Sequence, residues 1–148
     1  MILYRQAELE DVPRVAHLPR EGEAGGDSEE RMRRYLAGEH HPQQALPPRI
    51  MWIALDDEAP IGYTAGHLTR RFGCEGELQW IYVVAAYRRQ RIASQLLRLL
   101  ALWFVEQGAR RVCVDVGADD ARPFYRRSGA VELNRHWMVW DDIGAISR

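Results

Sequence analysis

The segment of residues 77–116 constrains the fold more than any other part of the chain. Apolar residues dominate 77–84, and valines alternate with other residues over 112–116, so each stretch is typical of a strand. Between them, apolar residues recur every three or four positions over 92–107, which predicts a helix with a wide buried face that ends at Gly108. A strand, a helix and a second strand in this order predict a parallel crossover.

The turn before this helix is basic. Arg88, Arg89 and Arg91 follow the first strand directly. The first turn of a helix has backbone N–H groups without intrahelical partners and carries the positive end of the helix dipole. An anion such as a phosphate is therefore expected to bind at the backbone amides of residues 89–94, with the arginines adding charge.

The rest of the chain supplies further strands and helices around the crossover. The patterns predict strands at 2–5, 50–55, 61–68, 131–133 and 136–140 and helices at 8–18, 29–37 and 120–127, with caps at Ser28, Asp119 and Asp120. No repeat or linker divides the sequence, so residues 1–148 are predicted to form one domain. The fold class is α/β, with antiparallel strands in the first half and one parallel crossover.

Three segments together resemble the GNAT superfamily of acyl-CoA-dependent N-acetyltransferases. The loop Arg88-Arg89-Gln90-Arg91-Ile92-Ala93 is similar to the family's pyrophosphate loop. The apolar stretch Trp80-Ile81-Tyr82-Val83 is similar to the strand that precedes that loop. Residues 121–130, which contain Tyr125 and Gly129, are similar to a segment near the family's C-terminus.

The resemblance implies a GNAT-like fold and a co-substrate. The fold would be a mostly antiparallel sheet with helices on both faces and a V-shaped cleft between the crossover strands. Acetyl-CoA would lie in that cleft, and a backbone N–H near Tyr82 and Val83 would stabilise the oxyanion. The cofactor-binding residues would be Ile81, Tyr82, Val83, Arg88, Arg89, Gln90, Arg91, Ile92, Ala93 and Ser94.

Three side chains are candidates for the proton transfers of an acetyl transfer to an amine. Glu77 is the first candidate for the base, because simple alternation along the strand places it on the side of Ile81 and Val83. Asp115 is its rival, since it interrupts a run of valines in the next strand. Either carboxylate is alternatively a structural or solvated residue. Tyr125 matches the family's motif tyrosine, a proton donor to the thiolate, and its alternative role is packing.

Two departures from the family pattern motivate a second hypothesis. Arg91 stands where the family usually has glycine. If its φ is negative, anion binding is expected to persist, whereas a positive φ would cost roughly 1 kcal/mol or more. Residues 116–120 also lack an asparagine that often contacts the cofactor. The alternative function is therefore a non-catalytic protein that binds acyl-CoA.

Composition narrows the partners and the location. The formal net charge is −1, with 20 basic and 21 acidic residues, which predicts neither a nucleic-acid nor a membrane partner. Two cysteines without metal-ligand spacing predict no metal site and suit a reducing compartment, so a cytoplasmic location is expected. The acceptor would be a small-molecule or peptide amine. Tryptophans on the last strand suggest the edge of a homodimer.

Overall fold

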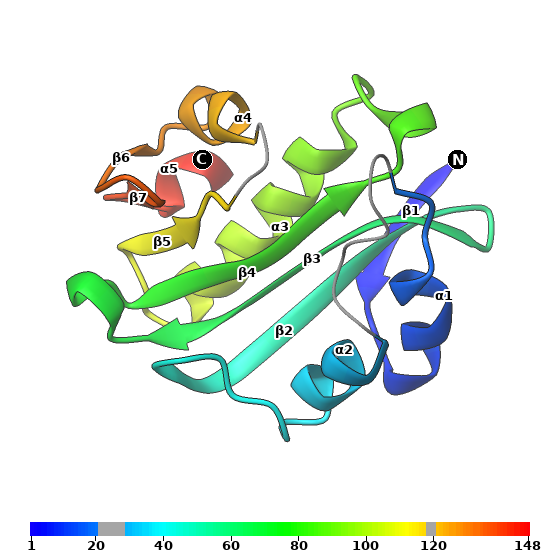
Figure 1. The fold of residues 1–148 in the computed structure, drawn as a ribbon. Helices are drawn as coiled ribbons and strands as arrows, with labels where there is room; N and C mark the ends of the chain where they lie inside the picture. Colours follow the sequence, from blue (N-terminus) through cyan, green and yellow to red (C-terminus); the bar gives the residue numbers. More distant parts are fainter. Residues whose placement is uncertain (21–28, 118–120) are drawn as a thin grey trace.

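The computed structural model describes residues 1–20, 29–117 and 121–148, whose strands form a seven-stranded sheet in the order β1-β2-β3-β4-β5-β7-β6 (Figure 1). All neighbouring strands run antiparallel except β4 and β5, which are parallel. The strands are β1 (Ile2–Gln6), β2 (Ala45–Asp56), β3 (Ala59–Thr69), β4 (Gly76–Val83), β5 (Val112–Asp115), β6 (Val131–Glu132) and β7 (Trp137–Trp140).

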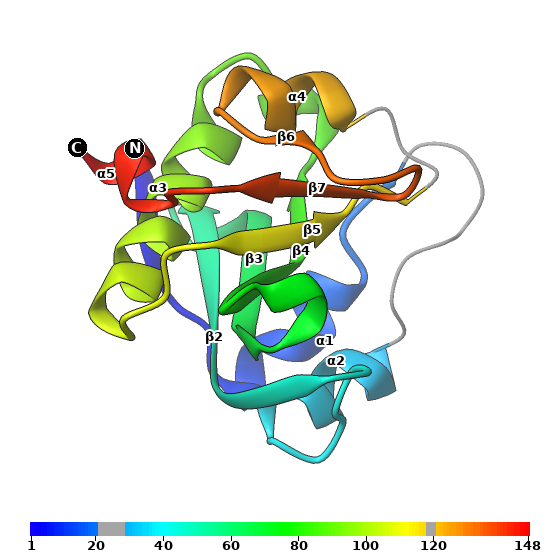
Figure 2. The same cartoon turned by 90° about the vertical axis from the view of Figure 1, so that its left-hand side faces the viewer.

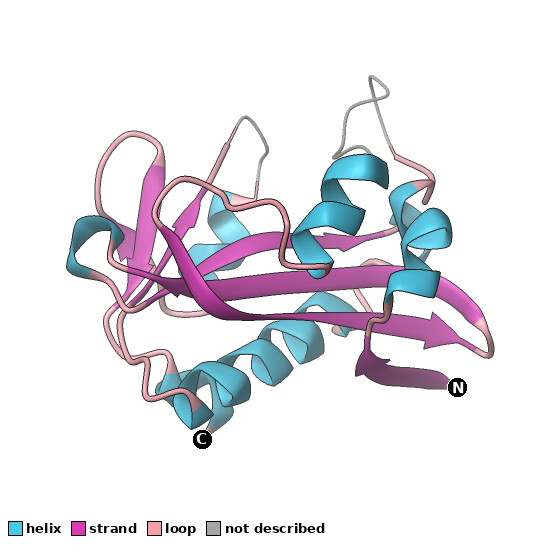
Figure 3. Cartoon of the chain, turned by 90° about the horizontal axis from the view of Figure 1, so that it is seen from below, coloured by secondary structure: helices cyan, strands magenta, loops and turns pink. Residues whose placement is uncertain are grey.

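Helices cover both faces of the sheet, as predicted (Figure 3). The long helix α3 and the short C-terminal helix α5 lie against one face, and α1 and α2 lie against the other (Figures 2 and 3). The helices are α1 (Val12–Ala16), α2 (Glu29–Leu36), α3 (Ile92–Glu106), α4 (Arg122–Arg127) and α5 (Gly144–Ser147). The fold is the mixed α/β arrangement that the sequence predicts, with α3 as the parallel crossover.

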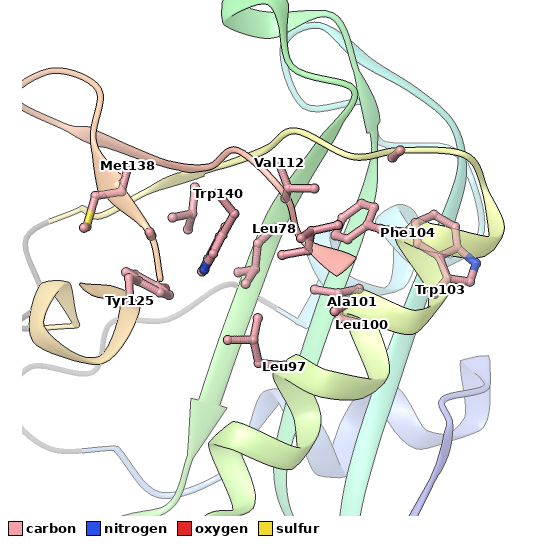
Figure 4. Close-up of a cluster of buried hydrophobic side chains, with 14 of the residues drawn as sticks. Leu78, Leu97, Leu100, Ala101, Trp103, Phe104, Val112, Tyr125, Met138 and Trp140 are labelled. Carbon is pink, nitrogen blue, oxygen red and sulfur yellow. The ribbon is translucent and has the colours of Figure 1, made fainter. Parts of the chain in front are cut away.

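The core is divided by the sheet into two layers. On the α3 side, Leu97, Leu100 and Phe104 pack against Leu78 and Val112 (Figure 4). On the α1 and α2 side, a second cluster is formed by side chains of both helices and of β2 and β3, among them Val15, Met32, Tyr35, Ile53 and Tyr63. Each layer buries the apolar face of its helices, which holds both sides of the sheet in place.

Two glycines allow α3 to approach the sheet closely. A Cβ at Gly76 would lie 2.5 Å from the Phe104 ring, and a Cβ at Gly66 would lie 2.9 Å from the same ring. Any larger residue at these positions would push the helix away from β3 and β4. The glycines therefore set the distance between α3 and β4, and with it the position of the turn that joins them.

Two expectations from the sequence need correction or addition. The strand β7 lies between β5 and β6 and is not an edge strand of the sheet, and its Trp140 is only 2% exposed, whereas Trp137 is partly buried. The helix α5 was not predicted, because only four residues form it. The predicted caps Ser28, Asp119 and Asp120 lie outside the described residues.

Candidate active site

The two parallel strands of the crossover pair only at their beginnings. Gly76, Glu77 and Leu78 of β4 pair with Val112, Cys113 and Val114 of β5. The strand β4 then continues to Val83, and within the described residues no strand pairs with its 79–83 segment on the β5 side. Apart from the Val83 carbonyl oxygen, which accepts a hydrogen bond from Arg88 Nε, the main-chain groups along that edge are therefore open to an extended ligand, which could add to the strand through hydrogen bonds.

A β-bulge at Gln79 reverses the faces of β4 within this segment. Ala65 of β3 pairs with Trp80, but the next residue of β3, Gly66, pairs with Leu78. The bulge adds one residue to β4, so side chains before and after it follow opposite alternation.

The consequence is that Glu77 does not share a face with Ile81 and Val83. Glu77 pairs with His67 and lies on the face of Trp80 and Tyr82, whereas Ile81 and Val83 lie on the α3 face. The prediction from simple alternation was wrong on this point, because it assumed an unbroken strand.

The turn between β4 and α3 has the backbone of an anion site. Among the described residues, the amides of 89–94 donate to no backbone carbonyl, and the first amide to do so is that of Gln95, to the Arg91 carbonyl at 3.0 Å. These amides surround the N-terminus of a 15-residue helix. The side chains of Arg88, Arg89 and Arg91 are exposed around them, so positive charge and N–H donors converge on one place.

The backbone of Arg91 has the positive φ that the sequence allowed as one of two possibilities. It precedes the first residue of α3 with φ 63° and ψ 20°, in the left-handed region, and Arg89 has φ 66°. The left-handed region is unfavourable for a residue with a Cβ. The backbone therefore has the conformation that glycine would adopt without strain, and the arginine adopts it nonetheless.

Arg88 turns back toward the strand that precedes it. Its Nε donates to the Val83 carbonyl oxygen at 3.0 Å, and its guanidinium carbon lies 5.6 Å from the centre of the Tyr82 ring. These contacts fix the end of β4 relative to the basic turn.

A hollow of about 400 Å³ lies beside this turn. Residues of the first half of α3, the end of α4 and α5 line it, namely Arg91, Ser94, Gln95, Leu97, Arg98, Ser128 and Ile146. Its mixture of arginines, hydroxyl groups and aliphatic side chains suits an anionic ligand that also has an apolar part. Only Arg91 and Ser94 of this set were predicted from the sequence.

Glu77 is buried within a polar network. It is 5% exposed, and its Oε1 accepts a hydrogen bond from Arg71 Nε at 3.1 Å. His67 Nε2 lies 3.8 Å from the same oxygen, and His67 Nδ1 is hydrogen-bonded to the Tyr35 hydroxyl at 2.9 Å. Burial raises the pKa of Tyr35, which keeps that hydroxyl protonated. The Glu77 carboxylate thus links β4 to Arg71 directly, and to Tyr35 of α2 through His67.

Asp115 lies in a more open position on the same face of the sheet. Cys113 pairs with Glu77 and Asp115 is two residues further along β5, so the two carboxylates point to the same side. Asp115 is exposed, and its Oδ1 accepts a hydrogen bond from the Gly117 amide at 2.8 Å. It follows the last residue of β5 that pairs with β4, at the point where the two strands cease to be neighbours.

Tyr125 is anchored in the core from α4. It is 5% exposed, and its ring lies edge-on to Trp140 with the centroids 5.7 Å apart (Figure 4). The indole of Trp140 donates to Ser128 Oγ at 3.2 Å, which ties β7 to the end of α4. The packing role that the sequence offered as an alternative is therefore present.

The structure brings some predicted residues together and separates others. The loop residues Arg88 to Ser94 converge at the start of α3, and Glu77 and Asp115 share a face on adjacent strands. Tyr125 comes from another element, on the α3 side of the sheet. Within the described ranges, no group of three or more His, Cys, Asp or Glu side chains is arranged to hold a metal ion, and no helix there is long and apolar enough to cross a membrane.

Comparison with known proteins identifies the family. Residues 12–130 match the acetyltransferase (GNAT) family. The chain belongs to the GNAT family. A comparison with curated proteins gave no match.

Several solved structures have the same fold. They include Arabidopsis thaliana NAA60 in complex with a bisubstrate analogue, at a TM-score of 0.74 and 17% identity over 95% of this chain and 97% of that one. The ribosomal-protein-S18-alanine N-acetyltransferase from Escherichia coli has a TM-score of 0.70 and 18% identity over 95% and 93%. The PaiA N-acetyltransferase from Thermoplasma acidophilum, in complex with coenzyme A, has a TM-score of 0.69 and 19% identity over 95% of this chain and 98% of that one.

The sequence did not predict the other residues of the hollow beside the turn as site residues. Gln95 and Arg98 follow Arg91 by four and seven positions, which places all three on one side of the helix. That spacing was available in the sequence. Ser128 and Ile146 come from other elements, and no local pattern connects them to the turn.

Proposed function

We propose that this GNAT protein is an acetyl-CoA-dependent N-acetyltransferase that transfers the acetyl group to a primary amine of a small molecule, peptide or protein. The observation that carries the proposal is the open edge of β4 at 79–83, which leads directly to the unpaired amides of residues 89–94. A ligand with an extended amide-bearing arm and a pyrophosphate, as in coenzyme A, matches this sequence of main-chain donors and acceptors.

The polar ends of the co-substrate would bind around the start of α3. The amides of 89–94, with Arg89 and Arg91, would hold the pyrophosphate. Arg91 and Arg98 in the adjacent hollow would contact the nucleotide end. The edge of β4 beside Ile81, Tyr82 and Val83 would hold the pantetheine arm, and a main-chain N–H there would stabilise the oxyanion as the amine attacks the thioester carbon.

Asp115 is the better placed of the two carboxylates to accept the amine's proton. It is exposed on the face opposite α3, and among the described residues only the Gly117 amide donates to it, through one of its two oxygens. Glu77 is buried and is already hydrogen-bonded to Arg71. A general base must reach the amine directly or through water, which favours the exposed group. Glu77 would position the start of β4, and Tyr125 would return a proton to the departing thiolate.

The first test is calorimetric titration with acetyl-CoA. Wild-type protein is expected to bind in the micromolar range, and Arg89→Ala is expected to weaken binding about tenfold because a charge-assisted contact to phosphate is lost. Arg70→Ala is the matched control, since Arg70 is exposed directly after β3, in the connection that leads to the start of β4. Equal affinities of the wild type and Arg89→Ala would refute the placement of the pyrophosphate.

Turnover distinguishes the enzyme from a protein that only binds acyl-CoA. Release of free CoA thiol in the presence of an amine panel is expected for the wild type. Asp115→Asn should lower kcat by about a hundredfold with little change in acetyl-CoA affinity. Binding of acetyl-CoA without thiol release from any amine would instead support the non-catalytic alternative.

A further inference from the structure

Among the half-buried arginines of the described residues, only Arg20 and Arg49 have no carboxylate within ion-pair distance. Arg71 and Arg122 pair with Glu77 and Glu132, and Arg111 pairs with Asp141. Arg49 donates to the carbonyl oxygens of Tyr35 and His40. Arg20 instead donates through Nη2 to the Tyr63 hydroxyl. A guanidinium has five N–H donors, and within the described residues only the one to Tyr63 has a hydrogen-bond acceptor, so the others are available to a ligand there.

Two tyrosines hold this guanidinium in place. Its central carbon lies 4.1 Å from the centre of the Tyr82 ring and 5.9 Å from that of Tyr63. The Tyr82 hydroxyl donates to the carbonyl oxygen of Pro19 at 2.5 Å, which fixes the residue next to Arg20 as well. Stacking on an aromatic face leaves the edges of a guanidinium free to form paired hydrogen bonds.

The position of Arg20 relates it to the proposed reaction. Tyr82 belongs to the part of β4 that β5 leaves unpaired, and its side chain is on the face that also presents Glu77 and Asp115. The guanidinium therefore lies over the strand that would hold the thioester, on the side away from α3. An acceptor that approaches from this side would meet a fixed positive charge.

We infer that Arg20 binds a carboxylate of the acceptor, so that the preferred substrates are amines with a carboxylate a few atoms from the nitrogen, as in amino acids. The inference rests on the proposed acetyl transfer. A planar carboxylate can accept two parallel N–H bonds from a guanidinium. Its negative charge would also neutralise a cation that has no carboxylate partner in the described residues. The same charge disfavours polyamines and other purely cationic acceptors.

Matched acceptors test the inference. Initial rates at saturating acetyl-CoA would be measured for amino acids, for their amides and for the corresponding decarboxylated amines. The wild type is expected to have a kcat/KM about tenfold to a hundredfold higher for the carboxylate compounds. Arg20→Gln should lose that preference while it retains the rate on the amides, Arg20→Lys should keep part of it, and Arg70→Gln should behave as the wild type. Equal rates on acids and amides by the wild type would overturn the inference and leave the acetyltransferase proposal standing.

A binding measurement separates this inference from the proposed reaction. N-acetylated amino acids would be titrated calorimetrically into the wild type and Arg20→Gln, with circular dichroism to verify that the variant is folded. At least tenfold weaker binding to Arg20→Gln supports the carboxylate site even if no amine is acetylated. Equal affinity for the two proteins, or no binding to either, overturns it.

Discussion

At the scale of single residues, Arg91 has the most unusual combination of identity and conformation at the proposed site. Its φ of 63° lies in the left-handed region, directly before the first residue of α3. The family pattern has glycine at this position, and the backbone here keeps the conformation that a glycine would take. The chain therefore preserves the geometry of the turn and adds a cation, at a cost in backbone energy of about 1 kcal/mol.

Substitution of Arg91 separates the backbone from the charge. Arg91→Gly and Arg91→Ala remove the same guanidinium, but only glycine relieves the left-handed strain. We expect Arg91→Gly to be more stable than Arg91→Ala by about 1 kcal/mol in the free energy of unfolding, measured by urea denaturation. Equal stability of the two variants would show that the turn relaxes to negative φ when the arginine is absent.

At the scale of elements, the contact between α3 and β4 determines where the basic turn lies. Gly76 at the start of β4 and Phe104 in the last turns of α3 are in contact because the glycine has no Cβ. The same helix begins at Ile92, beside the arginines. A substitution that displaces α3 at Phe104 is therefore expected to displace the basic turn at its N-terminus as well.

Gly76→Ala tests this contact. The added Cβ would lie 2.5 Å from Phe104 Cε1, so we expect a loss of about 1–3 kcal/mol in the free energy of unfolding. Phe104→Leu should recover part of that loss in the double variant, because the smaller side chain makes room for the methyl group. A double-mutant cycle by chemical denaturation measures the coupling. Additive effects of the two substitutions would contradict direct contact as the cause.

The elements also show which features a sequence can predict. The α3 crossover and its flanking strands were predicted because residues 77–116 combine two periodicities with a helix stop at Gly108. The bulge at Gln79 was not, since it depends on which residues of β3 face β4, and this long-range pairing leaves no local pattern. The burial of Glu77 against Arg71 and His67 was missed for the same reason.

At the scale of the whole molecule, Asp11 connects the first strand to the first helix. It is 2% exposed and accepts two hydrogen bonds from Arg5, each at 2.8 Å, and one from the Glu8 amide at 2.7 Å. The hydrogen bonds from Arg5 hold the pKa of Asp11 below its usual value. Because a small domain unfolds cooperatively, this local network contributes to the stability of the entire fold.

The lowered pKa of Asp11 gives the stability of the protein a defined dependence on pH. The unfolded chain takes up the proton near pH 4, before the folded protein does, so the contribution is complete above that pH and is lost as the pH falls below it. We expect Asp11→Asn to lower the free energy of unfolding at pH 7 by about 1–3 kcal/mol. Its difference from the wild type should shrink in urea titrations below pH 4. Glu10→Gln, an exposed neighbour, should have little effect at either pH.

The bulge at Gln79 has a consequence for how residues are compared across the family. Consider a relative whose strand lacks the bulge and is one residue shorter. If the two sequences are aligned without a gap from Glu77, the residues matched to Trp80 and Tyr82 lie on the opposite face of the relative's sheet. An alignment of β4 should therefore be anchored separately on each side of Gln79, with any gap assigned to that position. Insertions and deletions elsewhere in this strand would exchange the side chains that face α3 with those that face Arg20, and natural variation in length is expected to avoid them.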